Sequence, residues 1–152
     1  MTYCELLDEA YSYNVSVKEK PLIVHDGLCN GRKIAIRKNI PTHAEKACVL
    51  AEELGHFHYT VGNILDQNDI NNRKQEQVAR FYAYNKQVGL NGIIEAFNAG
   101  CRNQYEMAEY LGITEKFLDE AITRYRSKYG LCTKVDNYII YFEPTLIVIK
   151  MF

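Results

Sequence analysis

The stretch that most constrains this chain is residues 50–58, Leu-Ala-Glu-Glu-Leu-Gly-His-Phe-His. Apolar residues recur around it at helical spacing, which predicts a helix over residues 43–60 with one face on the core. Residues three and four apart share a helix face, so Glu52, Glu53 and His56 come together on the polar side. The fold must therefore bury one face of this helix and keep a group of ionisable side chains on another.

Local signals support this helix and a second one that follows it. Thr42 and Glu45 form a capping box, which places the start of the first helix. Gly55 lies within that helix at a cost of roughly 1 kcal/mol relative to alanine, so we expect another part of the chain to approach its backbone closely. After an asparagine cap, a second helix is predicted over residues 73–84.

The ionisable residues of these two helices have the spacing of a metal site. In the zinc-peptidase motif His-Glu-x-x-His, ligands occupy positions i and i+4 and a general-base glutamate follows the first. Here His56 holds the second ligand position, Glu53 the base position, and Glu52 stands where the first histidine would be. A catalytic zinc needs a third protein ligand, for which Glu76 on the second helix is the best candidate. The other interpretation is an ordinary solvated helix face.

Composition excludes several classes of protein. With 152 residues and 47% hydrophobic content, the chain can build one globular domain with a proper core. A formal net charge of −1 argues against a general polyanion-binding surface. Five cysteines without a Cys-x-x-Cys pair are typical of reduced thiols in a cytoplasmic protein. The acidic, amphipathic start is not a signal peptide, and no apolar run approaches the roughly 20 residues of a membrane span.

The rest of the chain predicts short strands and further helices. Residues 32–37 alternate apolar and polar side chains, which favours a half-exposed edge strand that can pair with an extended peptide. An edge strand protected by its charges is the other interpretation. Residues 14–20 are expected as a polar connection, residues 26–31 as a turn and residues 62–69 as a loop. Further strands are expected over residues 22–25, 138–142 and 146–149, and further helices over residues 2–12, 91–99, 104–111 and 115–128.

The helix pair over residues 103–129 has the outline of a helix-turn-helix. A DNA-reading helix carries Arg, Lys, Asn or Gln near its start. The second helix here begins with Glu115 and continues with Asp119 and Glu120, which would repel phosphate. We therefore predict a structural pair and no direct binding of nucleic acid.

Three stretches, residues 42–46, 50–56 and 72–80, resemble the ImmA/IrrE metallopeptidase family, and residues 108–111 and 141–144 resemble its small phage and mobile-element members. The resemblance implies an α+β, zincin-like metallopeptidase domain over residues 1–152, with a small mixed or antiparallel sheet packed on several helices. It also implies a cytoplasmic zinc-dependent endopeptidase that cleaves a helix-turn-helix repressor and so relieves repression. No membrane association is expected.

Within that resemblance, Glu53 is the general base and His56 and Glu76 are metal ligands. Glu52 replaces the usual histidine, and glutamate can bind zinc at about 2.0–2.2 Å. Two carboxylates reduce the net positive charge at the ion and shift the preference towards manganese. Arg80 suggests an alternative, because a bidentate Glu52–Arg80 pair would hold the helices together without metal. The protein would then be a catalytically inactive scaffold that binds a repressor or another protein.

Overall fold

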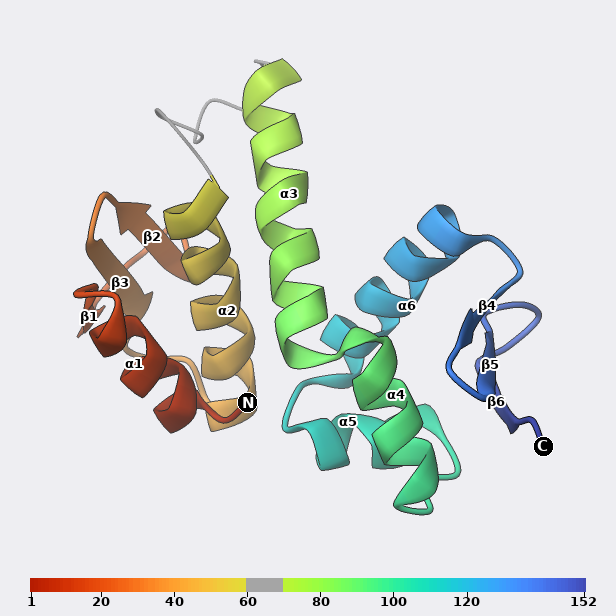
Figure 1. Ribbon diagram of the computed structural model, residues 1–152. Coiled ribbons are helices and arrows are strands. Elements are labelled where there is room, and N and C mark those ends of the chain that lie inside the picture. Colours follow the sequence, from red (N-terminus) through yellow and green to blue (C-terminus); the bar gives the residue numbers. More distant parts are fainter. Residues whose placement is uncertain (60–69) are drawn as a thin grey trace. The chain divides into compact units, whose positions relative to one another are not determined.

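The computed structural model describes residues 1–59 and 70–152 (Figure 1). The predicted loop over residues 62–69 lies outside the described residues. The chain divides into two compact units, residues 1–86 and 87–152. The single domain over residues 1–152 stays a prediction. Within the described ranges, no helix is both long and apolar enough to cross a membrane.

The first unit is a small mixed sheet covered by helices. Its elements are α1 (Tyr3–Ser12), β1 (Ser16–Lys20), β2 (Gly27–Asn30), β3 (Lys33–Arg37), α2 (His43–Tyr59) and α3 (Ile70–Gln87). The strand order is β1-β3-β2, with β1 parallel and β2 antiparallel to β3. Helix α1 contacts β1, and α2 contacts α1, β2 and β3 (Figure 1). The core residues include Leu6, Ile34, Ile36, Leu50 and Leu54.

The prediction of this sheet from sequence is wrong in four places. Strand β2 forms in the segment that was expected as a turn, and β1 forms in the expected polar connection. Residues 22–25 do not form a strand, because Ile23 and Val24 are 91% and 82% exposed and have no core to pack on. Strand β3 is central rather than an edge, since it pairs on both sides and buries Ile34 and Ile36.

Helix α2 begins and packs as its sequence predicts. The Thr42 hydroxyl accepts a hydrogen bond from the backbone N–H of Glu45 at 3.1 Å. A Cβ atom added to Gly55 would lie 2.5 Å from the carbonyl oxygen of Ala79 and 2.9 Å from its Cα. The backbones of α2 and α3 are therefore in direct contact, which confirms the close approach expected at this glycine.

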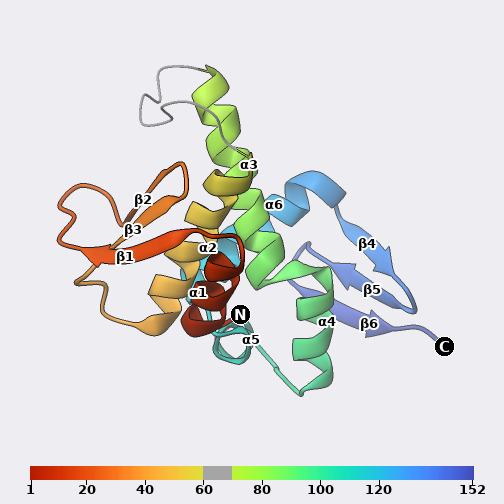
Figure 2. The ribbon, with the colours of Figure 1, turned by 60° about the vertical axis from the view of Figure 1, so that its left-hand side comes forward.

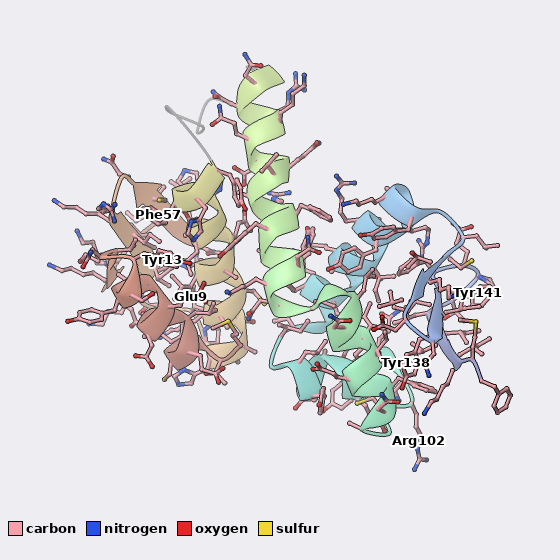
Figure 3. All side chains as sticks on the ribbon, viewed as in Figure 1. Glu9, Tyr13, Phe57, Arg102, Tyr138 and Tyr141 are labelled. Atoms are coloured by element: carbon pink, nitrogen blue, oxygen red, sulfur yellow. The ribbon has the colours of Figure 1, made fainter. Side chains whose placement is uncertain are left out.

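Two further contacts fix the helices of the first unit. Lys86 of α3 makes an ion pair with Glu9 of α1, with Nζ and Oε1 2.7 Å apart; Glu9 is labelled in Figure 3. His58 lies in an aromatic cluster, with its ring centroid 4.8 Å from that of Tyr13 and 5.3 Å from that of Tyr82. Burial lowers the pKa of His58, which favours the neutral ring among these aromatic neighbours.

The second unit packs three helices and an antiparallel sheet. Its elements are α4 (Gly89–Asn98), α5 (Gln104–Leu111), α6 (Glu115–Tyr129), β4 (Cys132–Val135), β5 (Tyr138–Tyr141) and β6 (Ile147–Lys150). Figure 2 shows the three strands side by side in the order β4-β5-β6. A hydrogen bond of 3.0 Å from Asn98 Nδ2 to the Tyr138 hydroxyl joins α4 to β5 (Figure 3).

The helix pair α5–α6 is part of this core. Asn103 and Thr114 cap the two helices, and Gly112 ends α5 with φ of 69°, a left-handed conformation that favours glycine. Five residues of α6 are buried: Phe117, Leu118, Ala121, Ile122 and Tyr125. This burial is what a structural helix pair requires.

Candidate metal centre

Three predicted ligands from two helices meet at the contact between α2 and α3. Glu52 and His56 lie one turn apart on α2, and Glu76 lies on α3. One ligand atom of each residue lies within 4.8 Å of those of the other two. His56 Nε2 and Glu76 Oε2 lie 3.3 Å apart. The Gly55–Ala79 backbone contact beside this group holds the two helices at the distance that the cluster needs.

Arg80 lies against both carboxylates of this cluster. Its Nε is 3.4 Å from Oε1 of Glu52 and 3.6 Å from Oε1 of Glu76. The expected Glu52–Arg80 pair is therefore present, although one nitrogen is shared between two carboxylates in place of the bidentate geometry that the sequence suggested. The carboxylate of Glu76 also has two partners, with Oε1 towards Arg80 and Oε2 towards His56.

Glu53 is buried against the backbone of strand β2. Its exposed fraction is 8%, which is unusual for a glutamate. A Cβ atom added to Gly27 would lie 2.7 Å from both Cγ and Oε1 of Glu53, and 2.8 Å from Cγ1 of Val49. Only a glycine at position 27 allows β2 to lie this close to Glu53.

Burial and mutual repulsion shift the pKa values of the carboxyl groups. Loss of solvent raises the pKa of Glu53 to about 8. Loss of solvent, together with a hydrogen bond donated to Glu76, raises the pKa of Glu52 to about 7. The pKa of Glu76 falls to about 2, because this carboxylate accepts hydrogen bonds from His56 and Glu52.

The two basic groups respond to the same charges. Burial lowers the pKa of His56, but the hydrogen bond to Glu76 and the neighbouring carboxylates outweigh it and raise the pKa. The carboxylates of Glu52 and Glu76 likewise raise the pKa of Arg80 against the effect of burial. The cluster therefore combines one readily ionised carboxylate, Glu76, with two basic side chains and two carboxyl groups that hold their protons more strongly than usual.

The donor set fits a small divalent cation. Tetrahedral zinc holds its ligands at about 2.0–2.2 Å, which places ligand atoms about 3.4 Å from one another. The three ligand atoms lie within 4.8 Å of one another, so small side-chain movements bring them to that separation. One imidazole and two carboxylates suit zinc or manganese. Glu52, His56 and Glu76 are therefore the residues that can hold a metal ion.

Sequence reasoning missed one residue of the site. Gly27 follows Asp26 in a segment that has the composition of a turn, so its place on the strand beside Glu53 was not expected. The strand predicted to pair with an extended peptide, over residues 32–37, is the central strand β3, and the edge strand in contact with α2 is β2.

One comparison with known proteins gave a match. The family model of the IrrE N-terminal-like domain matches residues 9–123, which is more than half of the chain and includes every residue of the cluster. Searches of curated proteins and of solved structures gave no significant match. The chain belongs to the IrrE N-terminal-like metallopeptidase family.

Proposed function

We propose that this protein is a metal-dependent endopeptidase of the cytoplasm that cleaves a helix-turn-helix repressor of a phage or mobile element. The observation that carries the proposal is the meeting of Glu52, His56 and Glu76 within 4.8 Å of one another, with a buried Glu53 on the helix that carries Glu52 and His56. The choice of a repressor as substrate rests on the resemblance of the sequence to small ImmA/IrrE members.

The proposed roles follow from where the side chains lie. Zn²⁺ or Mn²⁺ held by Glu52, His56 and Glu76 would supply polarisation of the scissile carbonyl and acidification of a water molecule. Glu53 accepts the proton of the attacking water and returns it to the leaving amine. Its burial under β2 raises the pKa to about 8, near the pH of the cytoplasm, where a carboxyl group can both take and release a proton.

The substrate is proposed to lie along β2. In the described part of the chain β2 pairs with β3 alone, so its other edge offers backbone groups to an extended peptide. Gly27 places this strand beside Glu53, and a peptide paired with β2 would pass close to the cluster. A helix-turn-helix repressor would present such a peptide from a loop or linker.

The test is cleavage of a proteome-derived peptide library, read by mass spectrometry with Zn²⁺ or Mn²⁺ added. We expect new peptide ends with the wild-type protein and none with Glu53→Gln. The matched control is Glu109→Gln, which neutralises an exposed glutamate of α5 and should leave cleavage unchanged. Cleavage that survives Glu53→Gln would refute the proposed role of Glu53.

The contact of Arg80 with Glu52 favours a second candidate function. An ion pair that holds α2 to α3 would allow the protein to act as a scaffold that binds a repressor or another protein without cutting it. Glu53→Gln separates the two functions, because a scaffold keeps its partner binding after that change and an enzyme loses its product.

A further inference from the structure

The helix pair α2–α3 carries a positive charge of its own beside the carboxylates that a metal ion would use. We propose that Arg80 is an internal counter-ion that competes with the metal ion for Glu52 and Glu76. In the metal-free protein Arg80 holds the two carboxylates, and the ion has to displace it. The inference concerns the site of the proposed function and goes beyond the ligand set.

The geometry gives Arg80 access to both carboxylates at once. Its Nε lies 3.4 Å from one oxygen of Glu52 on α2 and 3.6 Å from one oxygen of Glu76 on its own helix. Because Arg80 follows Glu76 by four residues, the two share a face of α3. One guanidinium therefore links the two helices through the same groups that would bind the ion.

The carboxylates cannot relieve their repulsion by moving apart. The backbones of Gly55 and Ala79 are in contact, and this fixes the separation of α2 and α3 next to the cluster. A cation beside two partly buried carboxylates stabilises them, because unpaired buried charge is strongly destabilising. Either Arg80 or a divalent ion can supply that cation.

The exposure of Arg80 makes displacement possible. Its side chain is 55% exposed, whereas that of Glu76 is 18% exposed. The guanidinium can move into water while its aliphatic stem stays on the helix. When two cations bind the same carboxylates, each lowers the affinity of the other by the same factor, since coupling between binding events is reciprocal. Removing the charge of Arg80 should therefore strengthen metal binding and weaken the metal-free fold.

The experiment compares the full-length wild-type protein with Arg80→Met, Arg80→Lys and Lys74→Met. Lys74 is an exposed cation on the same helix, and it lies about 200° around the helix from Glu76. Zn²⁺ affinity is measured by competition with a chromophoric chelator at fixed pH, and Tm is measured with and without Zn²⁺. Neither readout depends on activity.

We expect Arg80→Met to bind Zn²⁺ about tenfold tighter or more, because the cation that competes for Glu52 and Glu76 is removed. The metal-free Tm of this variant should fall and its rise on adding Zn²⁺ should exceed that of the wild type. Arg80→Lys keeps the charge and should stay closer to the wild type than Arg80→Met. Lys74→Met should match the wild type. If Arg80→Met folds only with Zn²⁺, that is the same result in its strongest form.

The outcomes separate this inference from the proposed function. Zn²⁺ binding by Arg80→Met but not by the wild type would support the inference and count against a metallopeptidase. Equal or weaker binding by Arg80→Met than by the wild type would overturn the inference and leave the proposed function standing. No binding by either protein would overturn both.

Discussion

Replacing Glu53 by glutamine should stabilise the metal-free protein, and more so as the pH rises. The pKa of Glu53 is raised from 4.5 to about 8 by burial. Between these values the folded protein keeps a proton that the unfolded chain has lost, so ionisable Glu53 lowers the free energy of unfolding as pH rises. Each pKa unit corresponds to about 1.4 kcal/mol, so the loss at pH 7.5 is roughly 4 kcal/mol and near pH 4.5 it is small.

Glutamine has almost the same shape and does not titrate, so Glu53→Gln removes this pH-dependent loss. The free energy of unfolding would be measured by urea denaturation in chelator at pH 4.5, 6 and 7.5. The difference between variant and wild type should grow by roughly 4 kcal/mol across that range. Glu109→Gln is the control, because that residue is exposed on α5. A difference that stays constant with pH would refute the account of Glu53 as a buried, protonated carboxyl.

This prediction links stability to the proposed chemistry. A base that is kept away from water destabilises the fold at neutral pH and is tuned for proton transfer at the same pH. Glu53→Gln should therefore gain stability in the test tube where peptide cleavage is lost. If Glu53 only filled space, Glu53→Gln would not be expected to raise the free energy of unfolding and abolish cleavage together.

Three further changes test the site. His56→Ala should abolish near-stoichiometric Zn²⁺ or Mn²⁺ in protein purified without chelator, as measured by elemental analysis, because it removes the only imidazole of the donor set. Gly27→Ala should force β2 away from Glu53, abolish cleavage and lower stability by about 1–3 kcal/mol in urea denaturation. Gly55→Ala should drive α2 from Ala79, with a similar loss of stability and weaker Zn²⁺ binding in chelator competition. Unchanged binding by Gly55→Ala would show that the helix contact does not set the ligand distances.

The helices and the ligand set were predictable because both depend on short-range spacing. Helix α2 was expected over residues 43–60 and is His43–Tyr59, and α5 ends where Gly112 follows. Two helices with known polar faces were enough to bring Glu52, His56 and Glu76 into one group. The family match over residues 9–123 confirms the resemblance from which the fold class was inferred.

The first sheet was not predictable in the same way, because short strands depend on partners far along the chain. Strand β2 contains only four residues and none of them is fully buried. Ile23 and Val24 look more like a strand but are exposed. The contact of Gly27 with Glu53 joins residues from different elements and depends on the register of β2, which no local pattern encodes.

Glu52 and Arg80 act together on the site, because each alters the effect of the other on a bound ion. Two carboxylate ligands cancel the charge of a divalent cation, which weakens its ability to acidify water. In the metal-free protein Arg80 lies within 3.6 Å of both. When an ion displaces it, Arg80 stays on the same face of α3 as Glu76, so its positive charge still acts on the site. With Glu53 ionised, the three carboxylates, the ion and Arg80 sum to zero. Arg80→Met should therefore bind the metal more tightly and yet cleave more slowly. The positive charge of Arg80 weakens metal binding, but it supports the reaction once the ion is bound. Measuring Zn²⁺ affinity and turnover on the same variant checks this, and an equal rise in both would refute it.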